Sequence, residues 1–370
     1  MNQETLRRVK FFPLTLAIIF LVNFLIGEAI LRVAVFSGLE LFTPIKKAQY
    51  FSPYGSENYY KLNNLFAVQR LGDLKRRQLF PHPELGWVGN FSAENYHHNK
   101  ESEIKGRQVV LLFGDSFANC MNNPIDYQDI LEQNNEFSKS YYLLNYAVDG
   151  YGLDQIYLLL TKVLDLYDNP IVLFSFTTID LDRSVVQLTV PQKPYFTAKG
   201  DTLYLKKPVR QSIDEFISMN PPMIGSYLGS FVKSIISLVY HNVFCPDTSV
   251  FGDSEQRIDP IKRVNKLILM KTIELLELKD INYKVLVFHT NWRGESPVNS
   301  NDWRDNFLLP LFDDLKVRPV WAKFLIQKDA LAMSTPFHQY FLSDGHPATQ
   351  YVQLVAEEIK SVIGLADVIK

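Results

Sequence analysis

The stretch "VVLLFGDSFANC", residues 109–120, joins a run of apolar residues to a glycine, an acid and a hydroxyl. Residues 109–113 predict a buried strand. Gly114, Asp115 and Ser116 then predict a turn into a helix. A serine there exposes its hydroxyl and directs its backbone N–H at a nearby anion. Ser116 is therefore either a nucleophile or the cap of an ordinary helix.

Strand and helix patterns alternate after this stretch. Strands are predicted at residues 141–146, 171–176 and 283–289, and helices at residues 153–166 and 261–279. Strands separated by helices are typical of a parallel sheet covered on both faces, which is the α/β class.

The carboxyl ends of parallel strands share one edge of the sheet, where ligands bind. "FGDSF", "NYAVDGYG" and "FTTIDLDR" each follow a predicted strand, so we expect them to meet there. Gly150 lacks a side chain and can bring its N–H close to a substrate oxygen. Together with the N–H of Ser116 it would form an oxyanion hole.

A base for Ser116 is offered by "DGHP", residues 344–347. A serine nucleophile needs an imidazole to accept its proton, and the imidazole needs a carboxylate to orient it. His346 and Asp344 provide both from one loop. The same residues also suit an ordinary capped turn.

The first forty residues predict a membrane anchor. Arg7, Arg8 and Lys10 precede residues 11–31, which are apolar enough and long enough to cross a bilayer. The basic flank places the amino terminus in the cytoplasm and the rest across the membrane. We therefore expect a single-pass inner-membrane protein with a periplasmic body. A cleaved signal peptide is the alternative.

Domain limits follow from this pattern. We predict a cytoplasmic tip and anchor at residues 1–38, a stalk or lead-in at residues 39–106, and the α/β domain at residues 107–370. The chain has 38 Lys and Arg against 40 Asp and Glu, a formal charge of -2. That balance argues against nucleic acid as a partner.

A further amphipathic helix is predicted within residues 223–240, where Ile224, Leu228, Phe231, Ile235 and Val239 share one side. Such a stripe normally packs on a sheet. The alternatives are a helix on the membrane surface and a helix that docks a membrane partner.

Taken together, the motifs resemble those of the SGNH or GDSL hydrolase superfamily. "GDSF" is similar to its first block, "NYAVDGYGLDQ" to its second and "DGHP" to its fifth. The resemblance implies a flavodoxin-like three-layer sandwich and hydrolysis or transfer of an ester-linked acyl group, without metal or organic cofactor. Ser116 would be the nucleophile, His346 the base and Asp344 its orienting acid. An acylated envelope glycan is the expected substrate, with a multi-span membrane acyltransferase as a possible partner for transfer.

Two features depart from that pattern. Ile179 stands where the family has an asparagine that donates to the oxyanion, so Thr178 or Thr177 would have to replace it. Losing one such donor costs about 10²–10³ in turnover. The Asp-x-His spacing resembles that of polysaccharide O-acetyltransferases and favours transfer. Loss of the asparagine also leaves open a non-catalytic scaffold or glycan-binding module.

Other residues are assigned more locally. Asn291 and Trp292, with Arg293, follow a predicted strand and are candidates for substrate binding, although a surface loop is the simpler interpretation. Asp180, Asp182 and Arg183 are expected to form a solvated charge cluster. Cys120 is expected to pack in the core, and Cys120 and Cys245 match no metal-ligand spacing.

Overall fold

The computed structural model describes residues 3–66, 79–189, 191–209, 212–244, 255–290 and 302–363. It divides the chain into two compact units. Unit 1 combines residues 1–68 with residues 214–253. Unit 2 combines residues 69–213 with residues 254–370.

Unit 2 contains a five-stranded parallel sheet with the order β4-β3-β5-β8-β9. Its strands are β3 (Gln108–Phe113), β4 (Tyr141–Asn145), β5 (Ile171–Thr177), β8 (Tyr283–Phe288) and β9 (Val320–Trp321). This order places the switch in winding direction between β3 and β5, as in flavodoxin-like folds. The α/β class and the four strands expected from sequence are confirmed; β9 was not predicted.

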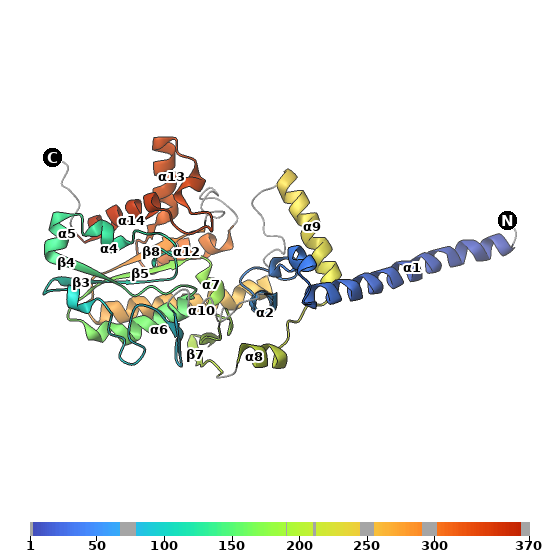
Figure 1. The fold of residues 1–370 in the computed structure, drawn as a ribbon, viewed down its shortest axis with the longest axis horizontal. Helices are drawn as coiled ribbons and strands as arrows, with labels where there is room; N and C mark the ends of the chain where they lie inside the picture. Colours follow the sequence, from blue (N-terminus) through green and yellow to red (C-terminus); the bar gives the residue numbers. More distant parts are fainter. Residues whose placement is uncertain are drawn as a thin grey trace. The chain divides into compact units, whose positions relative to one another are not determined.

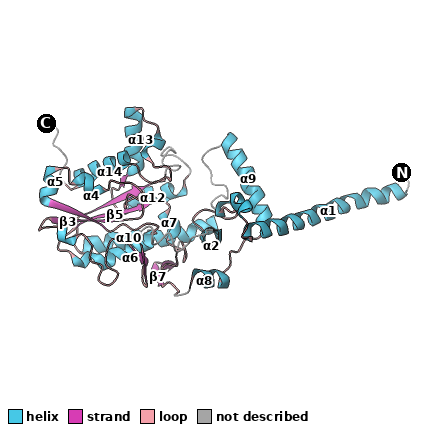
Figure 2. Ribbon diagram, viewed as in Figure 1, coloured by secondary structure: helices cyan, strands magenta, loops and turns pink. Residues whose placement is uncertain are grey.

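Helices cover both faces of the sheet (Figure 1; Figure 2). One face packs against α6 (Leu153–Val163), α10 (Glu255–Leu278) and α12 (Trp303–Asp314). The other packs against α4 (Tyr127–Leu131), α13 (Ala322–Met333) and α14 (Thr349–Val362). In β3, Leu111 and Phe113 face the first core, whereas Val110 and Leu112 face the second. A strand with apolar residues on both sides is what a doubly covered sheet requires.

The shorter elements of unit 2 complete the connections. They are β1 (Phe80–His82), β2 (Gly86–Val88), η3 (Glu101–Glu103), α5 (Asn135–Ser140), η4 (Leu164–Leu166), α7 (Asp180–Arg183), β6 (Tyr195–Lys199), β7 (Thr202–Lys206) and η5 (Phe337–Tyr340). The hairpin of β1 and β2 falls within residues 39–106, expected as a stalk or lead-in, yet it belongs to unit 2. Trp87 of β2 is 1% exposed and is part of the sheet core.

Unit 1 is built from α1 (Gln3–Phe36), η1 (Glu40–Ile45), η2 (Ala48–Tyr50), α2 (Glu57–Phe66), α8 (Ile213–Met219, from Asp214 on) and α9 (Tyr227–Phe244). Within α1, Phe12–Phe36 is long and apolar enough to cross a membrane, a test that a signal sequence also passes. A small core joins Leu31 and Val35 of α1 to Phe51, Leu62 and Tyr227.

The helix predicted within residues 223–240 is α9, but it does not pack on the sheet. It belongs to unit 1, where Ser234 is buried and Ile235 is exposed. The serine faces inward because its hydroxyl donates to the carbonyl oxygen of Tyr50, 2.8 Å away. The expectation that the apolar stripe covers the sheet was wrong.

Candidate active site

Ser116 lies on a tight turn after β3. A Cβ on Gly114 would come within 2.3 Å of Ser175 Oγ and 2.5 Å of Ala118 Cβ, so only glycine fits at this step. The expected helix after Ser116 is instead an irregular turn, with Asn119 N–H donating to Asp115 O and Met121 N–H to Ser116 O. Positive φ angles at Cys120 and Asn122, 51° and 64°, prevent a regular helix.

His346 lies in a loop before α14, 230 positions after Ser116 in the sequence. The loop is closed by hydrogen bonds from Leu342 N–H to His346 O and from Gly345 N–H to Leu342 O, at 2.7 and 2.9 Å. Gly345 has a φ of +87°, which suits glycine. His346 Nε2 lies 3.1 Å from Ser116 Oγ. That is hydrogen-bonding distance for a nucleophile and its base.

Asp344 lies beside the other ring nitrogen of His346. Its Oδ2 is 3.1 Å from His346 Nδ1, although the two groups are poorly aligned as a hydrogen bond. Catalytic hydrogen bonds in ligand-free proteins are often misaligned in this way. The carboxylate also accepts from the His346 N–H at 3.1 Å and from Asn122 Nδ2 at 2.5 Å. Asn122 was not singled out from sequence.

These contacts keep Asp344 ionised. Partial burial acts to raise the pKa of this carboxyl, but the hydrogen bonds from the His346 N–H and the Asn122 amide, and the nearby imidazole, outweigh it. The pKa of Asp344 therefore lies below its ordinary value. A carboxylate is the form that can orient an imidazole and stabilise its cation.

Two backbone N–H groups are available for an oxyanion. Within the described parts of the chain, neither Ser116 N–H nor Gly150 N–H donates a hydrogen bond. Gly150 has a φ of +78°. Two hydrogen bonds join the loop that contains Gly150 to the turn that contains Ser116. Val148 N–H donates to Gly114 O at 3.0 Å, and Asn119 Nδ2 donates to Asp149 Oδ1 at 3.0 Å.

Thr178 and Ile179 follow β5. The N–H of Thr178 is occupied, because it donates to Phe288 O at 3.0 Å. Its hydroxyl is buried and has no hydrogen-bond partner in the described structure. Ile179 is 5% exposed and its side chain cannot donate. In Thr178, the side-chain hydroxyl is therefore the group that remains free to donate a hydrogen bond.

A network of buried charged residues includes Asp115, which directly precedes Ser116 in the turn after β3. Asp115 accepts from Phe117 N–H and from Thr177 Oγ1, at 3.0 and 2.9 Å, and Arg183 Nη1 is 3.8 Å away. Burial raises the pKa of Asp115, and Arg183 opposes this. Asp180, bound to Arg183 at 2.7 Å, is fully buried. The expectation of a solvated cluster was wrong, since Asp182 is also buried, between Arg257 and Arg304.

The β1–β2 hairpin supports the Gly150 loop. Trp87 Nε1 donates to Asp149 O at 2.9 Å, and its ring lies 3.5 Å from where a Cβ on Gly150 would be. Tyr151 Oη donates to Trp87 O, and Gln155 Nε2 to Leu85 O. The sequence predicted residues 39–106 as a stalk or lead-in, since nothing local in the hairpin reveals a contact 62 residues away.

Several other candidates lie elsewhere. Asn291, Trp292, Arg293 and Cys245 fall outside the described residues. Burial raises the pKa of the Cys120 thiol well above its ordinary value, so the thiol stays protonated and is a poor nucleophile. Within the described residues, no group of His, Cys, Asp or Glu side chains could hold a metal ion.

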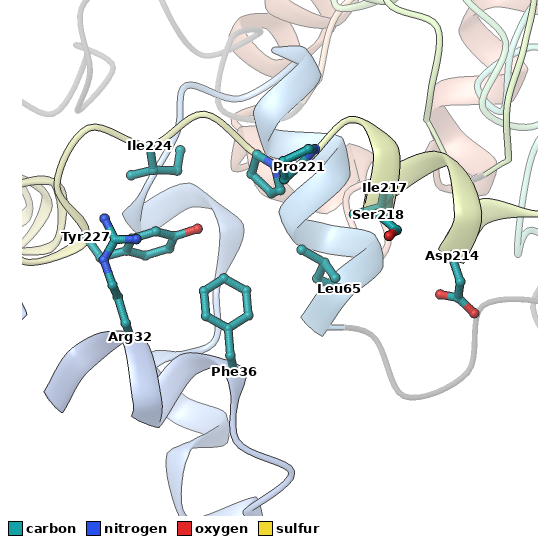
Figure 3. A pocket seen from close by; sticks show the side chains of 10 residues that line it. Arg32, Phe36, Leu65, Asp214, Ile217, Ser218, Pro221, Ile224 and Tyr227 are labelled. Carbon is teal, nitrogen blue, oxygen red and sulfur yellow. The ribbon is translucent and has the colours of Figure 1, made fainter. Parts of the chain in front are cut away.

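A separate cavity of about 410 Å³ lies in unit 1 (Figure 3). Phe36, Leu65, Ile224 and Tyr227 contribute its apolar walls, and Arg32 lies at one side. It contains none of the candidate catalytic residues.

No family model matches the chain, and no curated protein matches it in sequence. Among solved structures, it is similar to a GDSL-like lipase from Parabacteroides merdae, with 13% identity over 70% of this chain and 96% of that one, and a TM-score of 0.37. It is also similar to a member of the lipolytic G-D-S-L family from Veillonella parvula, with 12% identity, 70% and 98% coverage and a TM-score of 0.37.

A third similar structure is an acetylxylan esterase from Geobacillus stearothermophilus, with 11% identity, 70% and 94% coverage and a TM-score of 0.35. These proteins are of the kind that the sequence motifs resemble.

Proposed function

We propose that this protein is a serine-dependent acyl-ester hydrolase or O-acyltransferase, with Ser116, His346 and Asp344 as its catalytic residues. The observation that carries the proposal is the 3.1 Å distance between Ser116 Oγ and His346 Nε2. These two residues are 230 positions apart, and one serves as nucleophile and the other as base in this chemistry. The ionised Asp344 beside His346 supplies the third role.

The proposed reaction has two steps, acylation of Ser116 and removal of the acyl group. Ser116 Oγ attacks the ester carbonyl carbon, and its proton passes to His346 Nε2. The N–H groups of Ser116 and Gly150, and the Thr178 hydroxyl, stabilise the resulting oxyanion. When the C–O ester bond breaks, His346 returns the proton to the leaving alcohol. A water molecule or a sugar hydroxyl then attacks the acyl-serine and gives its proton to His346. As the bond between the acyl carbon and Ser116 Oγ breaks, His346 passes this proton to Ser116 Oγ, and the free acid or the acylated sugar is released.

The location and substrate are part of the proposal. The apolar helix of α1 and the basic residues before it support a single-pass inner-membrane protein with the chain after α1 in the periplasm. There the accessible acyl esters include those of envelope glycans. The acetylated substrate class is supported by the short Asp-x-His spacing of residues 344–346. Transfer would need an acyl donor, which a multi-span membrane acyltransferase could supply.

Covalent labelling tests the nucleophile. The full chain in detergent is treated with a fluorophosphonate probe and assayed with a chromogenic acetyl ester. The wild type should be labelled and active, and Ser116→Ala should abolish both. Ser138→Ala is the matched control, because the Ser138 hydroxyl only donates locally to Asn135 O; it should behave as wild type.

Two outcomes would contradict the proposal. Persistent labelling in Ser116→Ala would place the nucleophile elsewhere. Absence of both labelling and turnover in a folded wild-type chain would favour the alternative of a glycan-binding module, which Ile179 motivates. An acceptor oligosaccharide is then added to the active enzyme. Formation of acetylated oligosaccharide indicates transfer, and its absence indicates hydrolysis.

A further inference from the structure

Helix α9 exposes apolar side chains and buries a polar one. Val232, Ile235 and Ile236 are 44%, 39% and 63% exposed, whereas Ser234 is 1% exposed. These three residues share one face, since they are three and four positions apart. The other side of α9 is also apolar, since Tyr227 is buried and Leu228 and Phe231 pack against the core of unit 1. Helices on the surface of soluble proteins usually keep their exposed face polar. The exposed face of α9 therefore suits an apolar environment.

The first residues of α9 are attached to the apolar helix α1. Glu28 accepts from Tyr227 N–H at 2.9 Å and from Leu228 N–H at 2.7 Å, and so caps α9. Ser226 Oγ also donates to Glu28, at 2.8 Å. A Cβ on Gly27 would lie 2.9 Å from Leu228 Cδ2, so the glycine permits this approach. The start of α9 is thereby fixed to one level of α1.

That level lies near the far side of the bilayer if α1 spans it. Glu28 is 16 residues beyond Phe12, the start of the apolar span, which is about 24 Å at 1.5 Å per residue. A hydrocarbon core is about 30 Å thick. Counted from Phe12, α9 therefore begins just inside the outer boundary of the hydrocarbon. Its apolar face starts where acyl chains meet headgroups.

The direction of α9 keeps it at this level. In Figure 1, α9 (yellow) leaves the end of α1 (dark blue) at a steep angle. The contacts between them involve the beginning of α9, where Phe36 and Arg32 meet the Tyr227 ring. The described apolar part of α9, Tyr227–Ile236, is about 15 Å long, too short to cross the membrane. A helix of this kind lies along the surface.

We infer that α9 lies in the outer interface of the bilayer that α1 crosses, with Val232, Ile235 and Ile236 in contact with lipid acyl chains. The inference deepens the location given under the proposed function and rests on the span by α1. Lys233 is the only cation in Tyr227–Ile236, so apolar contact rather than charge holds the helix. Unit 1 thereby becomes a membrane-surface module and not a flexible stalk.

Site-specific fluorescence tests the position of α9. Cys245→Ser is introduced, buried Cys120 is kept, and single cysteines are labelled with an environment-sensitive dye in the full chain. The chain is reconstituted in vesicles of phosphatidylethanolamine and phosphatidylglycerol. Ile236→Cys probes α9, and Phe20→Cys, 73% exposed on α1, reports the span. Leu331→Cys, 83% exposed on α13, is the control in unit 2.

The expected result is a blue-shifted emission at positions 20 and 236. Spin-labelled lipid should quench position 236 most strongly when the label lies near the headgroup, and iodide should quench only position 331. Iodide access at 236 equal to that at 331 would overturn the inference. Absence of lipid quenching at position 20 would also overturn the inference, because α1 would then not span the membrane.

Two further outcomes separate other occupants of this face. If protection at position 236 disappears when the protein is diluted to one chain per vesicle, a second copy covers α9 and the inference fails. Failure here leaves the proposed chemistry intact, because labelling of Ser116 is measured on the same samples. Loss of that labelling with position 236 still in lipid would contradict the proposed function alone.

Discussion

At the scale of single residues, the extent of the proposed oxyanion hole depends on Thr178. Its hydroxyl is buried without a partner, and the neighbouring Ile179 cannot donate. An unpaired buried hydroxyl costs about 1–3 kcal/mol. Such a cost is explained if the hydroxyl is reserved for a charge that develops only during the reaction.

Thr178→Val separates the two roles of this side chain. The variant keeps the shape and removes the donor, so we expect kcat to fall by about 10²-fold while KM stays the same. The free energy of unfolding should not decrease, because no existing hydrogen bond is lost. Steady-state kinetics and thermal unfolding check this. An unchanged kcat with a higher melting temperature would show that the hydroxyl is idle.

The residues with short local signals were the ones that sequence could predict. Short sequence motifs contain Ser116, Gly150, Asp344 and His346. The structure brings Ser116 to hydrogen-bonding distance of His346. Asn122 was missed because its contact with Asp344 joins residues 222 positions apart. Only the folded chain shows such a contact. Asn291 and Trp292 lie outside the described residues and stay predictions.

At the scale of elements, the β1–β2 hairpin contacts the loop that contains Gly150, the proposed oxyanion donor. Trp87→Phe removes the hydrogen bond to Asp149 O while keeping an aromatic ring. Because small displacements of a catalytic donor are costly, we expect kcat to fall by about 10- to 100-fold with little change in KM. Kinetics of Trp87→Phe and of Trp321→Phe, on β9, provide the comparison. Equal kinetics in both variants would exclude this role.

A second element-scale prediction concerns Asp305 of α12, which joins three elements. It lies 2.9 Å from His289, after β8, and 3.1 Å from Lys323 of α13. Burial acts to raise its pKa, but the His289 hydrogen bond and the charges of His289 and Lys323 lower it below the ordinary value. Its stabilisation is therefore present above the unfolded pKa of about 3.9 and lost as pH falls through the folded value.

Melting temperatures measured from pH 7 to about pH 3 test this. Asp305→Asn should unfold at a lower temperature than wild type at pH 7, and the difference should shrink as the pH falls below about 4. Asp165→Asn is the control, since Asp165 is largely exposed and pairs with Lys279 at the surface. A constant difference between wild type and Asp305→Asn at every pH would contradict the assignment.

The elements also show where sequence patterns fail. The apolar runs in the sequence predicted β3, β4, β5 and β8 correctly, because strands of a sheet that is covered on both faces have apolar residues on both sides. The turn after Ser116 was predicted as a helix, since left-handed residues such as Cys120 and Asn122 carry no compositional signal. The helical period of the stripe at residues 223–240 was predicted correctly, but Ile224, Leu228 and Phe231 pack against the core of unit 1 and not on the sheet. Period alone does not reveal which surface an apolar stripe covers.

At the scale of the whole molecule, α1 is part of a folded unit as well as a candidate membrane span. Leu31 and Val35 contribute to the core of unit 1, and Glu28 caps α9. A chain that starts at Leu39 should therefore lose protection from proteolysis in residues 39–66 and 214–244. The sheet unit should remain intact and Ser116 should still be labelled.

Limited proteolysis followed by mass spectrometry checks this, with the full chain in detergent as control. Equal protection of residues 39–66 in both chains would show that unit 1 folds without α1. Loss of Ser116 labelling in the shortened chain would show that the sheet depends on the anchor.

The order of the segments has one more consequence. The backbone passes between the two units three times, after Val68, Ile213 and Asp253. A single cleavage at any crossing leaves fragments that stay joined, either by the remaining peptide connections or because each unit is assembled from two segments. One protease cut between the units therefore does not release the sheet unit from unit 1, as it would for a domain on a simple stalk.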